Sequence, residues 1–127
     1  MLRAMRTAGG PYSVTSHSLS IALNALNADD LLLRNYVDSI RRERDRFCTL
    51  LSGLNVYAIR SEANFVLLQS TSVDSYDRIM GEFGISTRAF PRDPDIADMR
   101  RVTMPGDEIA FNKLQQAITA AFTTVSQ

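Results

Sequence analysis

Residues 61–69, SEANFVLLQ, decide the fold of this chain. The four apolar residues from Phe65 to Leu68 are typical of a buried strand. The residues before them are small and polar, and Asn64 stands where the strand would begin. On local grounds, an Asn that bonds its own backbone and starts the strand explains this choice.

The residues before this strand have helical periodicity. A short helix is expected to end near Asn27, with Ser16 or Ser18 as its N-cap. A long helix is expected over residues 31–52, and Gly53 stops it. After Gly53 the sequence predicts strands at 55–60, 64–69, 85–90 and 100–104, and helices at 71–83 and 107–124.

This order of elements predicts an α+β domain. Strands this short, joined by tight turns, favour a small, mostly antiparallel sheet of about four strands with helices on one face. We expect one core between the sheet and its helices, made by Leu33, Val37, Ile40, Phe47, Val66, Leu68, Ile118 and Phe122.

Length and composition exclude several classes of function. A chain of 127 residues with formal net charge +0 has the size of one domain and no basic excess for a nucleic-acid backbone. Its apolar runs are too short to span a bilayer. Cys48 is the only cysteine, so we expect no internal disulfide and a cytoplasmic location. The acid-free opening MLRAMRTAGG also loosely fits a mitochondrial leader, and a short helix before a turn explains it equally well.

The chain has one histidine, one cysteine and one lysine, which limits the catalytic and metal sites that it can form. His17 is the only histidine and Lys113 is the only lysine, so we expect no His- and Cys-based metal site and no Ser-His-Asp device. The run RRERDR at 41–46 has interleaved acids, Glu43 and Asp45. These favour a solvated helix face with internal ion pairs over a nucleic-acid patch.

Five segments occur in an order that resembles a known family. They are GPYSVTSHSLSIAL, RRERDRF, SEANFVLL, GISTRAF and MRRVTM, and the last precedes a long helix. Together they resemble the carboxy-terminal part of pyridoxal-phosphate aminotransferases of the aspartate-aminotransferase fold, and most of all the histidinol-phosphate aminotransferase group. In that group the matching segments read Pro-Tyr-Asn-Val-Ser, Ser-x-Ala-Asn-Phe and Leu-Arg-Ile-Thr-Val. The resemblance covers nearly the whole chain.

The resemblance implies a division of the chain and a set of substrate-binding residues. Residues 1–28 would connect to a missing large domain, and 29–127 would be the aminotransferase small domain. Arg101 would hold the carboxylate of a small amino-acid substrate, since a guanidinium binds carboxylate bidentately. Asn64, Tyr12 and Ser13 would also line the substrate site, although the family usually has Asn where Ser13 stands. Strand alternation places Arg100 on the opposite face, where we expect it to be solvated.

The resemblance also implies that catalysis is incomplete in this chain. The family's Schiff-base lysine lies in a Ser-x-x-Lys segment of the large domain, before the point where this chain begins. Lys113 is expected to be a solvated residue of the last helix, so we assign no catalytic residue and expect this chain alone to bind no pyridoxal phosphate. Whether the chain takes part in an enzyme is left open by the sequence.

Three interpretations of function therefore remain. The chain is a fragment or split small domain of a transaminase, an inactive stand-alone binding module derived from that fold, or an unrelated structural domain. We expect as its partner either a complementary large domain or a second copy of the chain. The weakly charged amino-terminal segment favours association, with apolar residues Leu2, Met5, Tyr12, Val14, Leu19 and Leu23.

Overall fold

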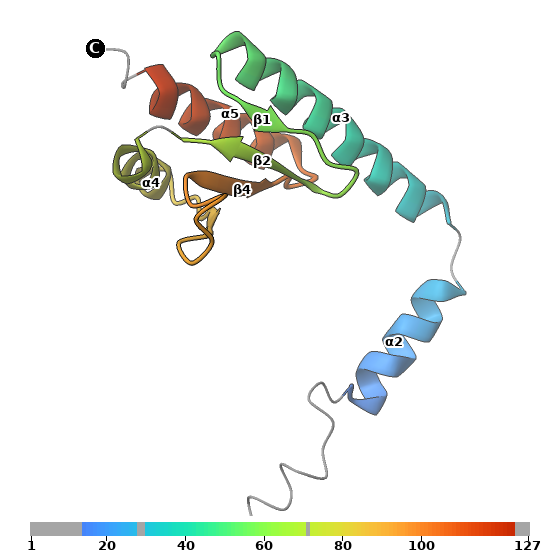
Figure 1. Ribbon diagram of the computed structural model, residues 1–127. Helices are drawn as coiled ribbons and strands as arrows, with labels where there is room; N and C mark the ends of the chain where they lie inside the picture. The colour runs from blue at the N-terminus through green and yellow to red at the C-terminus, as the bar shows by residue number, and fades with distance from the viewer. Residues whose placement is uncertain (1–13, 28–29, 71, 124–127) are drawn as a thin grey trace, which may run out of the picture. The chain divides into compact units, whose positions relative to one another are not determined.

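The computed structural model describes residues 14–27, 30–70 and 72–123 (Figure 1). Contacts divide the chain into two compact units, Met1–Leu32 and Leu33–Gln127. The elements in chain order are α2 (Ser16–Leu26), α3 (Leu31–Gly53), β1 (Ala58–Ile59), β2 (Phe65–Gln69), α4 (Val73–Glu82), β3 (Arg88–Ala89), β4 (Met99–Thr103) and α5 (Glu108–Thr123).

Helix α2 belongs to the first unit and buries none of its residues. Its N-cap is Thr15 and neither of the two predicted residues, Ser16 and Ser18, and the Thr15 side chain accepts a hydrogen bond from the Ser18 backbone N–H at 3.1 Å. The sequence of α2, SHSLSIALNAL, contains no Asp, Glu, Lys or Arg. An isolated helix of this length is marginally stable in water, so its exposed apolar residues need a covering surface.

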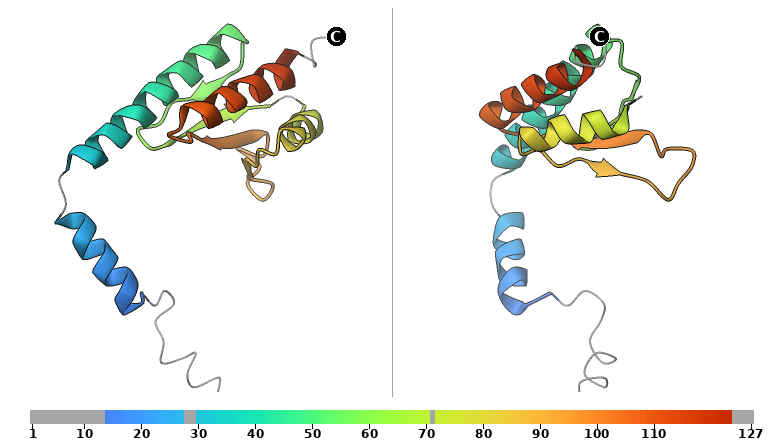
Figure 2. Two further views of the ribbon diagram at one scale, coloured as in Figure 1. Left: turned by 180° about the vertical axis from the view of Figure 1, so that it is seen from behind. Right: turned by 90° about the vertical axis from the view of Figure 1, so that its left-hand side faces the viewer.

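The second unit contains a four-stranded antiparallel sheet with the order β1-β2-β4-β3. Its centre is the pairing of β2 with β4, in which Val66 lies opposite Val102 and Leu67 lies opposite Arg101. Figure 2 shows the helices of this unit on one side of the sheet. The predicted α+β class is thus confirmed, although β1 and β3 have two residues each and are shorter than predicted.

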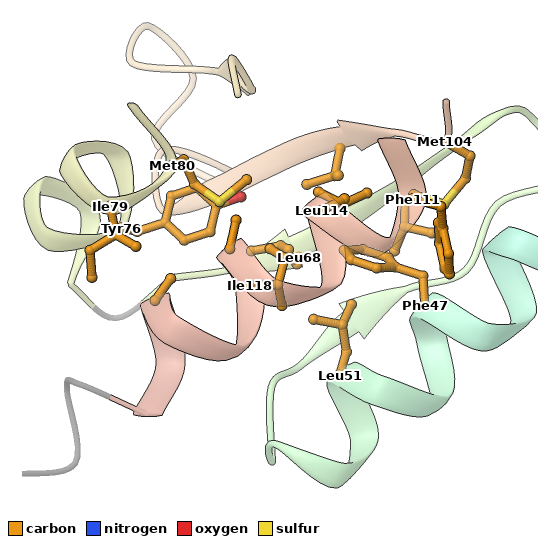
Figure 3. Close-up of a cluster of buried hydrophobic side chains, with 14 of the residues drawn as sticks. Phe47, Leu51, Leu68, Tyr76, Ile79, Met80, Met104, Phe111, Leu114 and Ile118 are labelled. Atoms are coloured by element: carbon orange, nitrogen blue, oxygen red, sulfur yellow. The ribbon is translucent and has the colours of Figure 1, made fainter. Parts of the chain in front are cut away.

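The core lies between the sheet and helices α3, α4 and α5 (Figure 3). Five predicted core residues are buried, namely Ile40, Phe47, Val66, Leu68 and Ile118. Phe122, also predicted for the core, is partly buried against this cluster. The prediction was wrong for Leu33 and Val37, which are 63% and 37% exposed. Both precede Ile40, the first buried residue of α3. No helix in the described part of the chain is long and apolar enough to cross a membrane.

The charged run of α3 is only partly solvated, which corrects the sequence-based expectation. Glu43 and Arg44 are buried at 2% and 8% exposure. The Glu43 carboxylate accepts a hydrogen bond from the Gly106 N–H, and Arg44 Nη1 donates to the Ala63 carbonyl at 3.0 Å. The run also pairs with other elements, as in the 2.8 Å contact of Arg46 with Glu108. α3 thereby fixes the turn before β2 and the turn after β4.

Candidate functional site

The side chains of two consecutive arginines of β4 lie on opposite faces of the sheet. Arg100 lies opposite Leu68 on the face that the helices cover, and Arg101 lies opposite Leu67 on the open face. The sequence prediction of opposite faces was therefore correct. The expected solvation of Arg100 was wrong, because its exposure is 3%.

Arg100 is fully engaged in structural contacts. Its Nε and Nη2 donate to the two carboxylate oxygens of Asp77 on α4 at 3.0 and 2.9 Å. Its Nη1 donates to the carbonyls of Ala97 and Met99. The hydrogen bonds to Asp77 raise the pKa of Arg100, so the guanidinium stays charged despite its burial. We therefore assign Arg100 to the structure of the domain rather than to ligand binding.

Arg101 has a different environment on the open face. Its guanidinium carbon lies 5.2 Å from the centre of the Phe65 ring, an arrangement in which the ring face attracts the cation. The Arg101 Nε is buried and donates no hydrogen bond in the structure. No ion pair of Arg101 is formed within the described residues, so its planar fork of donors is available to an anion.

A second arginine, Arg88 on β3, is the Cα partner of Arg101 across the sheet. Side chains of paired residues point to the same face, so both guanidinium groups belong to the open face. Arg88 is exposed, and its guanidinium carbon lies 6.0 Å from the Phe90 ring centre. It too forms no ion pair within the part of the chain that the structure describes. Sequence reasoning missed Arg88, because only the pairing of β3 with β4 brings it to Arg101.

Asn64 marks the start of β2 and has a backbone role. Its carbonyl accepts a hydrogen bond from the Met104 N–H at 2.8 Å, beyond the last pair of the β2–β4 ladder. The register thus places Asn64 beside Met104 and not beside Arg101. Asn64 is exposed. The predicted site residues Tyr12 and Ser13 lie outside the described part of the chain.

Lys113 lies on α5, on the covered side of the sheet. It is exposed, as expected, and its amine is near Gly84: a methyl group placed on Gly84 would lie 3.8 Å from the Lys113 Nζ. The only primary amine of a side chain is therefore on the other side of the sheet from Arg101. Within the described residues, no group of three His, Cys, Asp or Glu side chains could hold a metal ion.

Comparison with known proteins supplies the family. The family model "Aminotransferase class I and II" matches residues 1–118. A histidinol-phosphate aminotransferase of Ruminiclostridium cellulolyticum is 31% identical over 111 residues, and histidinol-phosphate aminotransferase 1 of Legionella pneumophila strain Paris is 26% identical over 112. Each alignment covers 85% of this chain and 30% of the relative, so the chain spans about a third of the length of these proteins.

A solved structure supports the same fold. The crystal structure of a suggested aminotransferase from Burkholderia pseudomallei K96243 superposes with a TM-score of 0.66 and 24% sequence identity. The match covers 95% of this chain and 37% of that one. On the family model and the identity to the Ruminiclostridium protein, this chain belongs to the aminotransferase class I and II family.

Proposed function

We propose that this chain is a fragment or split small domain of a histidinol-phosphate-aminotransferase-like transaminase. Its role is to bind the substrate carboxylate and to close over the substrate, and it does not complete catalysis alone. The names of the relatives and the 30% of their length that the chain spans support this proposal.

The observation that carries the proposal is the pair formed by Arg88 and Arg101. Two like charges directly opposite each other in a sheet repel, and no carboxylate within the described residues pairs with either. An anion between the two guanidinium groups would remove this repulsion. The buried Nε of Arg101 lacks an acceptor that such an anion would supply. An amino acid carries a carboxylate, and a phosphate ester of an amino alcohol carries a phosphate, so either could occupy this position.

The described residues do not fit pyridoxal phosphate as a Schiff base. The reaction of the family needs a lysine that bonds the cofactor beside the bound substrate. Lys113 is the only lysine of the sequence, and it lies on the helix-covered side of the sheet while Arg101 lies on the open side. A complementary large domain would have to supply both the cofactor site and the lysine. In this proposal, the chain alone therefore carries out no step of transamination.

A second candidate function is an inactive binding or assembly module. The exposed, uncharged α2 favours it, because such a helix can join a second copy of the chain as well as a large domain. Both candidates share the open face of the sheet. They differ in whether mixing with a large domain restores transamination.

The anion-binding part of the proposal can be tested on the full chain by titration calorimetry with L-glutamate and with inorganic phosphate. We expect Arg101→Met to weaken binding by about tenfold or more, since it removes charge-assisted hydrogen bonds. Arg92→Met is the matched control, because Arg92 is an exposed arginine outside the sheet. Equal affinities of the wild type and Arg101→Met would contradict the role of Arg101.

Complementation separates the two candidate functions. A large domain from a relative, carrying its Ser-x-x-Lys segment, is mixed with this chain, and transfer of the amino group from L-glutamate is measured. Activity that depends on Arg101 supports the transaminase fragment. Complex formation without activity supports the inactive module.

A further inference from the structure

A cavity lies on the helix-covered side of the sheet, apart from Arg88 and Arg101. Its volume is about 320 Å³, and it adjoins a larger hollow of about 410 Å³ that shares Gly84, Ile85 and Ser86 with it. This smaller hollow lies between the amino-terminal half of α5, the end of β4 and the segment after α4. Its walls are mainly apolar, formed by Ile85, Val102, Pro105 and Leu114. A volume of this size is at the lower end of the range for small-molecule sites.

Among the described residues, Lys113 is the only charged one that lines the cavity. Its amine forms no ion pair or hydrogen bond with the residues that the structure describes. The Nζ lies beside Gly84, which also borders the cavity, so the amine is at the cavity and not directed away along α5. Ser86 and Thr103 are the other polar residues of the lining.

We propose that this cavity binds a small monocarboxylate with an apolar body. The apolar body would contact Ile85 and Pro105, above the nearly buried Val102 and Leu114, and the carboxylate would accept hydrogen bonds from the Lys113 amine. The argument is charge complementarity: the lining has one cation, no acid and mostly apolar side chains. Neither Arg88 nor Arg101 lines this cavity, and the buried Val102 at its floor points to the side of β4 opposite Arg101, so the site is distinct from the proposed substrate face.

Lys113 also has a purely structural explanation. Gly84 follows the end of α4, where a nearby cation interacts favourably with the last carbonyls of the helix. On that explanation the amine stabilises α4, and substitution of Lys113 lowers the stability of the domain without changing any affinity. The two explanations thus differ in a measurable way.

The test uses the full chain labelled with ¹⁵N and two matched probes, 3-phenylpropionate and 3-phenylpropan-1-ol. We expect the acid to shift the amide signals of Ile85, Ser86 and Ala110, and the alcohol to bind about tenfold more weakly because it lacks the charge. Lys113→Met should reduce the affinity for the acid to that of the alcohol, and Lys113→Arg should retain most of it. Gln116→Met, at an exposed position of the same helix, should leave it unchanged.

Two further variants locate the binding. Ala110→Leu fills the cavity from α5 and should abolish binding of both probes. Arg101→Met should have no effect, which separates this site from the proposed substrate face. Equal affinity for acid and alcohol, an unchanged affinity in Lys113→Met, or a loss of affinity in Arg101→Met would each overturn the proposal. A lower thermal midpoint of Lys113→Met with unchanged affinity would establish the structural explanation instead.

Discussion

The carboxylate of Glu43, buried in α3, accepts a hydrogen bond from the backbone N–H of Gly106 at 2.8 Å. This contact connects the middle of the long helix to the turn between β4 and α5, 63 residues later in the chain. Burial is the main cause that raises the pKa of the Glu43 carboxyl above 4.5, and the hydrogen bond from Gly106 partly opposes it.

The raised pKa predicts a pH dependence of stability. A carboxyl that binds its proton more tightly in the folded state contributes stability that is fully present below pH 4.5 and is lost as the pH rises through the raised pKa. We expect Glu43→Gln, which keeps an oxygen acceptor for Gly106, to gain stability relative to the wild type as the pH rises from 4 to 7. Denaturant titrations across that range measure the difference. A constant difference would contradict the prediction.

Glu108 serves as a control, because its pKa is shifted in the direction opposite to that of Glu43. The hydrogen bond from Arg46 lowers the pKa of the Glu108 carboxyl, so its contribution is present above pH 4.5 and is lost as the pH falls. Glu108→Gln should therefore lose stability relative to the wild type at pH 7, with a smaller difference at low pH. Two variants that follow the same trend would show that general acid effects dominate.

The ion pair between Arg100 and Asp77 predicts that substitutions of its two partners change the free energy of unfolding by different amounts. Asp77→Ala leaves the buried Arg100 guanidinium without its carboxylate, and we expect a loss of about 1–3 kcal/mol, reduced from the value for a fully buried pair because Asp77 is 47% exposed. Arg100→Leu leaves only the half-exposed Asp77 carboxylate, which water can solvate, but it also removes the donor to the Ala97 and Met99 carbonyls, so it should be destabilising by less than Asp77→Ala. Denaturant unfolding at pH 7 measures both. A larger loss for Arg100→Leu than for Asp77→Ala would contradict this expected order of the two variants.

Replacing Gly106 or Gly84 by Ala tests how much the added methyl group destabilises the domain at two positions with similar backbone conformation. Both have positive φ, +73° and +64°, so either Ala substitution should cost about 1–2 kcal/mol in backbone strain. At Gly106 the new Cβ would also lie 2.6 Å from Tyr36 Cε2, whereas at Gly84 the nearest atom is 3.8 Å away. We therefore expect Gly106→Ala to destabilise the domain more than Gly84→Ala. Equal losses in thermal unfolding would show that Tyr36 moves aside without cost.

The faces of α3 give a prediction for the core. Phe47 is fully buried, and Phe47→Ala should cost about 3–5 kcal/mol of unfolding free energy. Leu33 is 63% exposed, and Leu33→Ala should change it by less than about 0.5 kcal/mol. An unchanged thermal midpoint for Phe47→Ala would mean that Phe47 does not lie on the buried face of α3.

Local hydrophobic patterns of the sequence predicted the helices and strands well, but they predicted less well which of their faces are buried. The apolar run at Phe65–Leu68 predicted β2 because burial on a sheet needs such a run wherever it occurs. Helical periodicity predicted α3 but not how far its buried face extends, so it placed Leu33 and Val37 in the core although both precede Ile40, the first buried residue of the helix. Periodicity describes which residues share a face, and only the neighbouring elements decide whether that face is covered.

The candidate site shows the same limit. Sequence alternation separated Arg100 from Arg101 correctly, since side chains of a strand alternate. It could not predict that Asp77 on α4 allows Arg100 to be buried, nor that β3 places Arg88 opposite Arg101. Both relationships join residues from different elements, and no local pattern encodes them.

The last prediction concerns association through α2. Leu19, Ile21 and Leu23 are all more than half exposed, and α2 carries no Asp, Glu, Lys or Arg that would oppose contact with a like helix. We expect the full chain to form a dimer or larger assembly, in which this helix contacts another copy of the chain. Light scattering over a range of concentrations measures the mass. Leu19→Glu combined with Leu23→Glu should give a monomer, because buried charges in an apolar interface are costly. Asn24→Glu adds a charge at an exposed polar position of the same helix and should weaken association less. A mass that equals one chain at every concentration, in the wild type as in the double variant, would show that α2 does not join copies of this chain.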